Sequence, residues 1–452
     1  MVIKKSLVSF LAALVWTFGF LAATTPLIAA DKEKVLYSFC LVSGCADGAE
    51  PNSGLILDSA GNLYGTTANG GTTGGPCGQV GDFIGCGTVF ELVRNENGGW
   101  TEKVLHTFNY DDGAEPSASL VFDGAGNLYG TTEAGGAGRC MDYSGDVIGC
   151  GTVFRLTPDS NGKWTEKVLH QFESNGKDGN GPSGSLILDA SGNLYGTTGA
   201  GGTGKCPEGA AVGCGTVFQL TPGTNGQWTE KVLHSFKGGD GVGPSGVILD
   251  VAGNLFGTAH VGGAYDDGTI FELTPAANGK WTLKVLHRFG LGPDGILPNG
   301  ALILDATGNL FGATLADGTP GGNCGKFGCG TVFELKPGSN GQWTEKVLHR
   351  FNGDDGSDPQ GGLIFDAAGN LYGVNGTGGD NNYGTIFQLI PAPNGKWTEK
   401  VLRRFDSRDG TTPNPNLIFD ANGNLYGTTR SGGANRSGCF GFGCGTVFEI
   451  TP

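Results

Sequence analysis

The sequence predicts an all-β protein, a seven-bladed β-propeller of four-stranded antiparallel blades whose last blade is closed by the N-terminal strand. Three short motifs recur seven times, at a spacing of about 50 to 65 residues that is typical of propeller blades. Glycines at fixed offsets separate short runs of Val, Ile, Leu, Phe and Tyr, which indicates many short strands joined by tight turns. The two ends of the chain carry complementary parts of one repeat, which favours a closed ring.

The recurring motifs mark equivalent positions in each repeat. The first motif, Gly-Asn-Leu-(Tyr/Phe)-Gly, begins at Gly61, Gly126, Gly192, Gly253, Gly308, Gly369 and Gly423. The second motif, Gly-Thr-(Val/Ile)-Phe, begins at Gly87, Gly151, Gly215, Gly268, Gly330, Gly384 and Gly445. The third motif, Val-Leu-x-x-Phe, begins at Val35, Val104, Val168, Val232, Val285, Val347 and Val401.

Each unit divides into four strands at its turn residues. In the first copy we expect strands over 54–58, 62–67, 87–93 and 100–108, called strands A to D below. Asn97-Gly98 joins strands C and D, and both residues tolerate the positive φ angles of a type I′ hairpin turn. The asparagine recurs at Asn161, Asn225, Asn278, Asn340 and Asn394.

The chain ends indicate how the ring closes. The segment 34–39 has the pattern of a strand D, whereas the last unit stops after a strand C at 446–452. Pairing the two completes one blade and removes an exposed edge; an open solenoid with truncated end units is the alternative. The predicted organisation is a signal peptide over 1–30 and a single propeller over 31–452, with a closing strand over 31–39 and blades over 51–108, 113–172, 179–236, 241–289, 295–351, 356–405 and 410–452.

The first thirty residues have the pattern of a secretory signal peptide. Lys4 and Lys5 precede an apolar stretch over 7–23, and small residues follow at 29–30. An uncleaved membrane anchor is the alternative interpretation, but the apolar stretch is short for a membrane span. No other segment of the chain could cross a bilayer. We therefore expect a secreted protein, periplasmic or extracellular, with no transmembrane span in the mature chain.

The charge of the chain restricts its partners. The sequence has 28 Lys and Arg against 43 Asp and Glu, a formal net charge of −15 that becomes −17 when Lys4 and Lys5 leave with the signal peptide. Such a surface repels phosphate backbones, which argues against nucleic acid as a partner. Cations, neutral glycans and basic proteins remain as possible partners. We expect the protein to be a monomer.

The motifs resemble those of the choice-of-anchor tandem repeat GloVer-containing family, whose hallmark is G-N-L-Y-G-T-T followed by G-G and G-T-V-F. In the first repeat the hallmark stands at 61–67, 70–71 and 87–90, and the resemblance covers 31–452. It implies a secreted bacterial β-propeller-like repeat protein and brings no activity or catalytic residues to transfer. Members often carry a C-terminal sorting anchor, whereas this chain ends at Thr451-Pro452 without one.

Twelve cysteines fall into six close pairs, five of them in the connection between strands B and C. The pairs are Cys40 and Cys45, Cys77 and Cys86, Cys140 and Cys150, Cys206 and Cys214, Cys324 and Cys329, and Cys439 and Cys444. In the fourth and sixth units both cysteines are missing together, which favours a disulfide within each loop. A zinc site would need four converging ligands, so no metal bound by thiolates is expected.

The face formed by the B-to-C and D-to-A connections, called the loop face below, is where we expect function, because its loops vary in length. Its D-to-A connections carry Asp-Gly-x-x-Pro with the aspartates Asp47, Asp112, Asp178, Asp240, Asp294, Asp355 and Asp409. A ring of these carboxylates around the channel mouth could bind a cation such as Ca²⁺, with Glu50, Glu115 and Asp358 adding oxygen ligands. The alternative, favoured by the sevenfold repetition, is that each aspartate caps its own turn; no other cofactor is expected.

Other recurring side chains suggest structural roles. Strand D carries His106, His170, His234, His287 and His349, which we interpret as packing or edge-protecting residues. Strand D opens with Trp100, Trp164, Trp228, Trp281, Trp343 and Trp397, expected to anchor the packing of the blades. The aspartates Asp58, Asp123 and Asp189 of the A-to-B turns are expected to form Asx turns.

Positions that break the symmetry offer the candidates for chemistry. Directly after strand B, three repeats carry Glu133, His260 and Arg430, which could supply a base, an acid and an anion clamp. The leading hypothesis is nevertheless a non-catalytic scaffold whose disulfide-braced loop face binds an extracellular protein or carbohydrate. The alternative is a propeller lyase or hydrolase that uses these three residues on a polysaccharide or a small molecule.

Overall fold

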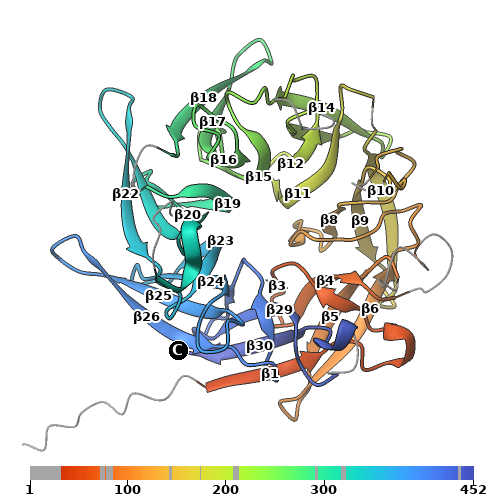
Figure 1. Ribbon diagram of the computed structural model, residues 1–452. Coiled ribbons are helices and arrows are strands. Elements are labelled where there is room, and N and C mark those ends of the chain that lie inside the picture. The colour runs from red at the N-terminus through yellow and green to blue at the C-terminus, as the bar shows by residue number, and fades with distance from the viewer. Residues whose placement is uncertain are drawn as a thin grey trace, which may run out of the picture.

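Seven β-sheets stand around a common axis, which confirms the predicted seven-bladed propeller (Figure 1). This computed structural model describes residues 32–71, 77, 85–141, 145–173, 175–206, 213–290, 294–316, 322–435 and 439–452. The predicted signal peptide, 1–30, lies outside these residues. Over the described ranges, no helix is both long and apolar enough to cross a membrane.

The blades, numbered I to VII, each contain strands A to D from the axis outward. Blade I comprises β2 (Ala49–Pro51) and β3 (Ile56–Leu57), β4 (Leu63–Asn69), β5 (Thr88–Arg94) and β6 (Trp100–Thr107). Blade II comprises β7 (Val121–Phe122), β8 (Leu128–Thr132), β9 (Thr152–Pro158) and β10 (Trp164–Gln171). Blade III comprises β11 (Gly179–Leu188), β12 (Leu194–Gly201), β13 (Thr216–Pro222) and β14 (Trp228–Ser235). Blade IV comprises β15 (Val242–Leu249), β16 (Leu255–Val261), β17 (Thr269–Pro275) and β18 (Trp281–Arg288).

The remaining blades follow the same order. Blade V comprises β19 (Ile296–Leu304), β20 (Leu310–Ala316), β21 (Thr331–Pro337) and β22 (Trp343–Arg350). Blade VI comprises β23 (Ser357–Phe365), β24 (Leu371–Thr377), β25 (Thr385–Pro391) and β26 (Trp397–Arg404). Blade VII comprises β27 (Thr411–Pro413) and β28 (Ile418–Phe419), β29 (Leu425–Ser431), β30 (Thr446–Thr451) and β1 (Lys32–Ser38). Short 3₁₀ turns occupy loops at η1 (Ser43–Cys45), η3 (Gly322–Phe327) and η4 (Cys439–Gly441).

The N-terminal strand closes the ring as predicted. β1 pairs antiparallel with β30, from Lys32 opposite Thr451 to Ser38 opposite Thr446, with a bulge between Val35 and Tyr37. Figure 1 shows the first strand lying beside the last one in blade VII. Blade VII is therefore a composite of both ends of the chain, and the sheet has no missing outer strand.

The second and third motifs meet between blades. The phenylalanine at the end of strand D packs against the phenylalanine of Gly-Thr-(Val/Ile)-Phe in the next blade, as Phe108 does edge-on against Phe154 with ring centroids 5.1 Å apart. The equivalent pairs are Phe39–Phe90, Phe172–Phe218, Phe236–Phe271, Phe289–Phe333, Phe351–Phe387 and Phe405–Phe448. These rings are buried, and burying one contributes about 1.5 to 3 kcal/mol. The motifs thus recur because every blade interface needs the same pair.

The first motif, Gly-Asn-Leu-(Tyr/Phe)-Gly, also contributes to the packing between blades. Its second glycine leaves room for the phenylalanine ring, since a Cβ added at Gly65 would lie 2.7 Å from Cζ of Phe90. Its aromatic residue packs against the tryptophan that opens strand D of the next blade, as Tyr64 does against Trp164 at 6.3 Å between centroids. The expected packing role of the tryptophans is confirmed at the six of the seven interfaces that contain one.

The A-to-B turns are Asx turns, as predicted. Asp58 Oδ1 accepts hydrogen bonds from the backbone N–H groups of Ala60 and Asn62, and Asp58 Oδ2 accepts one from the Tyr64 hydroxyl. The same bonds recur at Asp123 and Asp189. This face of the propeller is therefore uniform.

Small residues let the innermost strands approach one another closely around the axis. A Cβ added at Gly184 would lie 2.7 Å from the Gly246 Cα, so blades III and IV meet there backbone to backbone. Asn416 Nδ2 of blade VII donates a hydrogen bond to Ser119 Oγ of blade II, 3.2 Å away. The inner strands are therefore joined by direct backbone and side-chain contacts.

Candidate functional site at the loop face

Each of the seven D-to-A connections leads into a residue in the left-handed conformation that directly precedes a proline. These residues have φ angles between 53° and 63° and are Glu50, Glu115, Gly181, Gly243, Leu297, Asp358 and Thr412. The N–H group of each donates to the carbonyl that precedes the second motif of the preceding blade, as Glu115 N does to Cys86 O at 3.1 Å. Five of these acceptors are disulfide cysteines, so each disulfide also fixes the start of the next inner strand. The repeated bond explains why non-glycine residues tolerate a strained conformation.

Three carboxylates and one guanidinium gather where blades VII, I and II meet at the channel mouth. Arg430 Nε lies 3.5 Å from Glu50 Oε2, which also accepts a hydrogen bond from Asn69 Nδ2 at 3.2 Å. Desolvation in the mouth raises the pKa of Glu115; Arg430 lowers this pKa and Glu50 raises it. Desolvation and the Glu115 carboxylate also raise the pKa of Glu133, against the opposing effect of Arg430, although the side chains of Glu115 and Glu133 remain accessible to solvent.

The structure brings together two of the three residues proposed for catalysis. Glu133 and Arg430 belong to one electrostatic cluster, because the charge of Arg430 acts on Glu133. His260 lies on β16 of blade IV, and its ring Nδ1 is 3.3 Å from the carbonyl oxygen of Pro298 on blade V. The described contacts therefore do not connect His260 with the other two residues.

The seven loop-face aspartates face the outer strand of their own blade. Asp112 Oδ2 lies 3.1 Å from His106 Nε2, and Asp112 Oδ1 accepts the Asn109 N–H. Histidine is the partner of Asp112, Asp178, Asp240, Asp294 and Asp355. Tyr37 is the partner of Asp47, and Arg403 is the partner of Asp409.

These contacts match the interpretation that the sevenfold repetition favours, in which each aspartate caps its own turn, because each is held by that turn and by a strand-D side chain rather than in a shared ring. Within the described part of the chain, no three carboxylate or histidine side chains converge within 4.8 Å of one another. A calcium role for these aspartates stays a prediction. The histidines pack as expected, edge-on against the strand-D phenylalanine, and they also bind the aspartates.

A half-buried glutamate from the next blade acts on most of these pairs, an arrangement that the sequence pattern did not indicate. Glu230 of blade III acts on the pair His170 and Asp178 of blade II; burial and Asp178 raise its pKa to about 7, and His170 lowers it. Glu102, Glu166 and Glu345 occupy equivalent positions and also have a pKa of about 7. Blade IV instead carries Leu283 at this position. The glutamate recurs in the strand-D pattern W-T-E-K, so its position could be found from the sequence. Its partners could not, because its contacts cross from one repeat to the preceding one.

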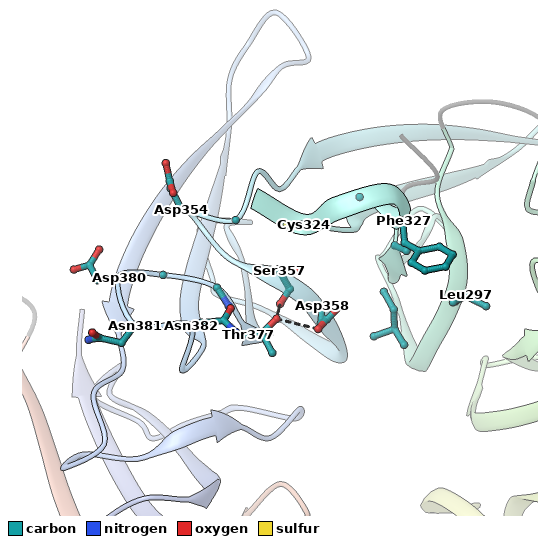
Figure 2. A pocket seen from close by; sticks show the side chains of 16 residues that line it. Leu297, Cys324, Phe327, Asp354, Ser357, Asp358, Thr377, Asp380, Asn381 and Asn382 are labelled. Carbon is teal, nitrogen blue, oxygen red and sulfur yellow. Dashed lines mark hydrogen bonds between the residues drawn. The ribbon is translucent and has the colours of Figure 1, made fainter. Parts of the chain in front are cut away.

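A pocket of about 820 Å³ opens between blades V and VI on the loop face. Its apolar wall contains Leu297, Leu315 and Phe327, and the Phe327 side chain is 58% exposed. Figure 2 shows Leu297 and Phe327 on one side, with Asp354 and Asp380 on the other side and Asp358 between them.

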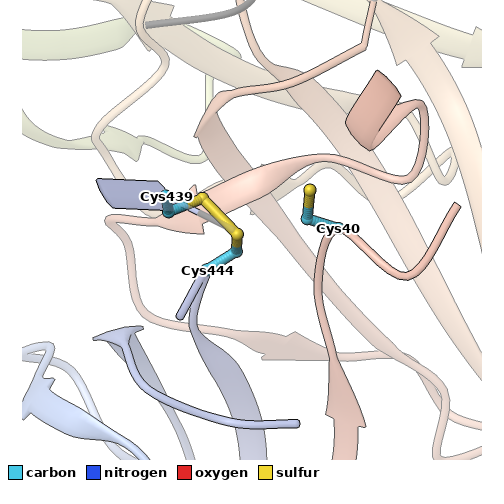
Figure 3. A group of neighbouring side chains, drawn as sticks. All are labelled: Cys40, Cys439 and Cys444. Atoms are coloured by element: carbon cyan, nitrogen blue, oxygen red, sulfur yellow. A yellow bond between two sulfur atoms is a disulfide. The ribbon is translucent and has the colours of Figure 1, made fainter. Parts of the chain in front are cut away.

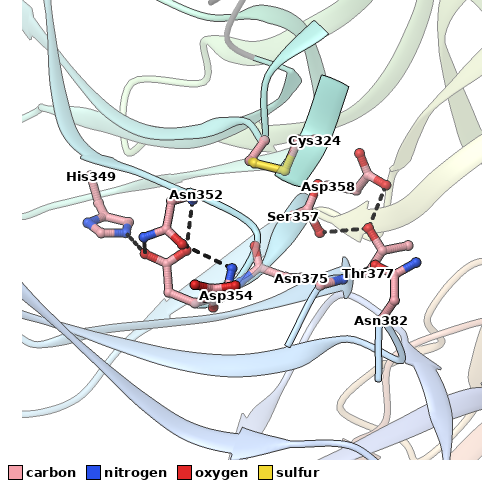
Figure 4. The surroundings of a disulfide bond; sticks show 12 residues. Cys324, His349, Asn352, Asp354, Ser357, Asp358, Asn375, Thr377 and Asn382 are labelled. Carbon is pink, nitrogen blue, oxygen red and sulfur yellow. Dashed lines mark hydrogen bonds and ion pairs between the residues drawn. A yellow bond between two sulfur atoms is a disulfide. The ribbon is translucent and has the colours of Figure 1, made fainter. Parts of the chain in front are cut away.

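Hydrogen bonds fix the polar wall of this pocket. Thr377 Oγ1 donates to Asp358 Oδ2 at 2.9 Å, and Asn382 Oδ1 accepts the Gly378 N–H at 2.8 Å. Arg404 Nε lies 3.4 Å from Asp380 Oδ1. The disulfide of Cys324 lies beside the segment bearing Asp354 and Ser357 and holds the loop that carries Phe327 (Figure 4). The pocket is therefore built from loops that are braced at both blades.

All six predicted disulfides are present within their loops. Their number fits an oxidising compartment. The sulfur atoms of Cys40, Cys439 and Cys444 lie within 4.8 Å of one another, a proximity that sequence spacing did not reveal (Figure 3). All three are in disulfides, so they offer no thiolate to a metal in this state.

Comparisons with known proteins agree with the repeat architecture. The family model described as the Gloeobacter/Verrucomicrobia repeat matches residues 27–206 and 203–441. No curated protein sequence matches the chain. A structure of an ulvan lyase, described as a new family of polysaccharide lyase, has a TM-score of 0.51 at 12% identity and covers 88% of this chain and 93% of its own. A gluconolactonase from Xanthomonas campestris has a TM-score of 0.40 at 16% identity, with coverage of 77% and 87%. At such identities these similarities show the fold alone.

Proposed function

The chain belongs to the Gloeobacter/Verrucomicrobia repeat family, and on this premise we propose that it is a non-catalytic binding protein for a neutral extracellular carbohydrate. The proposed site is the pocket between blades V and VI. The observation that supports it is an apolar wall facing a polar wall within one pocket of about 820 Å³. This volume lies within the range of small-molecule sites.

The two walls complement the two surfaces of a sugar. A sugar ring exposes C–H groups on its faces and hydroxyl groups at its edge, so an exposed aromatic ring and nearby oxygen acceptors can bind both. Phe327 offers such a ring, and Asp358 and Asn382 offer side-chain oxygens across the pocket. Because Thr377 and the disulfide of Cys324 already hold this geometry, little ordering is needed on binding.

The charge of the pocket favours a neutral ligand over an acidic one. Asp354, Asp358 and Asp380 line it, and Arg404 pairs with one of them, Asp380. The chain as a whole has a formal net charge of −15. A uronic acid or sulfated sugar would therefore be repelled on approach and in the site.

A polysaccharide lyase or hydrolase is the second candidate, favoured by the cluster of Glu115, Glu133 and Arg430. Glycoside hydrolysis uses a carboxylic acid that keeps its proton near neutral pH beside a second carboxylate. Glu133, whose pKa is raised by desolvation and by the Glu115 carboxylate, and Glu115 itself are the candidates for these two roles. If the purified chain shortens a polysaccharide and Glu133→Gln abolishes this, the non-catalytic proposal is wrong.

A glycan array followed by calorimetry tests the binding proposal. We expect neutral glycans to bind, and Phe327→Ala or Asp358→Asn to weaken binding at least about tenfold, which is about 1.4 kcal/mol. Asparagine suits position 358 because it tolerates the left-handed conformation found there. Phe442→Ala is the matched control, since Phe442-Gly443-Cys444 in blade VII repeats Phe327-Gly328-Cys329 outside the pocket. Unchanged affinity in both pocket variants, or binding of acidic glycans only, would contradict the proposal.

A further inference from the structure

Two disulfides meet at the seam where the ends of the chain pair. Cys40–Cys45 lies directly after β1, and Cys439–Cys444 lies directly before β30. The sulfur of Cys40 is within 4.8 Å of both Cys439 and Cys444 (Figure 3). All four cysteines pack in one apolar cluster with Phe39 and Val447.

Backbone and side-chain hydrogen bonds hold the two cysteine loops against each other. Phe39 N donates to Gly445 O at 3.0 Å, and Asn435 Nδ2 donates to Cys40 O at 2.6 Å. Ala434 N donates to Ser38 Oγ at 3.2 Å. The proximity of the sulfurs therefore follows from the pairing of β1 with β30, and it brings together residues about 400 positions apart in the sequence.

We propose that this seam is a disulfide-exchange junction, at which the two loop disulfides convert into two disulfides that join the N-terminal strand covalently to the last blade. In the loop-paired form, β1 is held by non-covalent contacts alone. In the cross-paired form, Cys40 and Cys45 are bonded to Cys439 and Cys444, and the ring is covalently closed.

The exchange needs one external thiolate, from a small thiol or an oxidoreductase, and returns it unchanged. The thiolate attacks Cys45 Sγ, forms a mixed disulfide there and releases the Cys40 thiolate. Cys40 attacks Cys439 Sγ, which is more exposed than Cys444, and releases the Cys444 thiolate. Cys444 then attacks Cys45 in the mixed disulfide and expels the external thiolate. Two disulfides are consumed and two are formed, with no net oxidation.

The cross-paired form should resist unfolding more than the loop-paired form, because its disulfides restrict the unfolded chain more strongly. A loop disulfide at the seam closes a loop with a sequence separation of 5, whereas a cross-seam disulfide closes a loop of about 400 residues. The longer loop removes more freedom from the unfolded chain, so the cross-paired ring should unfold at a temperature about 2 to 5 °C higher. The exchange would thus stabilise the ring at the point where it can open.

The pair Cys324 and Cys329 of blade V is the internal control. It has the same spacing as both seam pairs. In the described part of the chain, no third cysteine lies within 4.8 Å of it in such a group. It can therefore reform only its own disulfide.

Incubating the mature chain in a glutathione redox buffer tests the proposal, with non-reducing digestion and mass spectrometry as the readout. We expect peptides that join Cys40 or Cys45 to Cys439 or Cys444, a faster band on a non-reducing gel, and no mixed peptide containing Cys324. Only loop-paired peptides after equilibration would overturn the proposal.

A variant in which only Cys40 and Cys439 lack their loop partners provides a second test of the proposal. The double variant Cys45→Ser, Cys444→Ser leaves Cys40 and Cys439, and we expect no free thiol after air oxidation. The matched variant Cys45→Ser, Cys329→Ser leaves Cys40 and Cys324 and should retain two free thiols. Two free thiols in the first variant, with circular dichroism showing a folded propeller, would overturn the proposal.

Discussion

Replacing Glu230 with glutamine should stabilise the propeller near neutral pH and remove part of the pH dependence of its unfolding. Glu230 lies between blades II and III, where it faces His170 and Asp178, and its Oε1 atom is buried without a hydrogen-bond partner. Glu173 and Lys177 line the same hollow, which has a volume of about 560 Å³. The carboxyl group is therefore costly to ionise in the folded state.

The sign of the effect follows from the raised pKa. The pKa of Glu230 is about 7 in the folded chain, against an ordinary value of 4.5. The folded state thus holds this proton more tightly, so stability falls as the pH rises from about 4.5 to about 7 and changes little above that range. The difference corresponds to about 3 kcal/mol for a fully buried carboxyl, and solvent screening of this partly buried group reduces it to about 1 to 2 kcal/mol.

Denaturant titration between pH 4.5 and 8.5 measures this effect. We expect Glu230→Gln to raise the free energy of unfolding by about 1 to 2 kcal/mol at pH 8 and to leave it nearly unchanged at pH 4.5. The reciprocal variant Leu283→Glu places a carboxyl beside His234 and Asp240 of blade III, and it should lower stability at pH 8. If Glu230→Gln follows the parent's pH profile, or is less stable at pH 8, the reasoning about these carboxyl groups is refuted.

Three further substitutions test the packing and pairing of the blades by thermal and denaturant unfolding. Gly87→Ala should cost more than about 3 kcal/mol, because its φ is 93° and a Cβ would lie 2.7 Å from Pro116 Cδ of the next blade; an unchanged melting temperature would contradict this. Arg403→Met should cost about 3 kcal/mol, because it leaves the Glu33 carboxylate, 2.9 Å from Arg403 Nη2, buried without its partner, and a loss below about 1 kcal/mol would refute it. Lys167→Met removes an exposed hydrogen bond to the next hairpin and should cost less than about 0.5 kcal/mol; a larger loss would show that the hairpin tips bind the blades more tightly than we infer.

The repeat and its closure could be predicted because each blade interface uses the same residue types. Phe108 and Phe154, and Tyr64 and Trp164, belong to motifs that the sequence displays seven or six times. The disulfides could be predicted because cysteines are present or absent in pairs. These features depend on local spacing, which a single sequence contains.

The site was less accessible to prediction because its contacts cross between repeats. The partners of Glu230 are on the preceding blade, and a repeat pattern does not say which copy a side chain faces. Phe327 and Phe442 occupy equivalent positions, yet Phe327 alone of these two lines the pocket between blades V and VI, where the neighbouring loops provide the opposite wall. Likewise, equivalent positions after strand B suggested Glu133, His260 and Arg430 together, but a repeat pattern could not show that Arg430 acts on Glu133 while His260 contacts the Pro298 carbonyl of blade V.

Electron paramagnetic resonance of nitroxide labels at positions 34 and 451 tests the closure of the ring most directly. Lys34 of β1 and Thr451 of β30 are exposed and lie diagonally across the pair, since Lys34 is opposite Glu449, so their Cα atoms should be about 7 to 8 Å apart. Strong dipolar broadening that persists when labelled protein is diluted with unlabelled protein is the predicted result. Spectra without broadening, or broadening that disappears on dilution, would show that the N-terminal strand does not complete the last blade of its own chain.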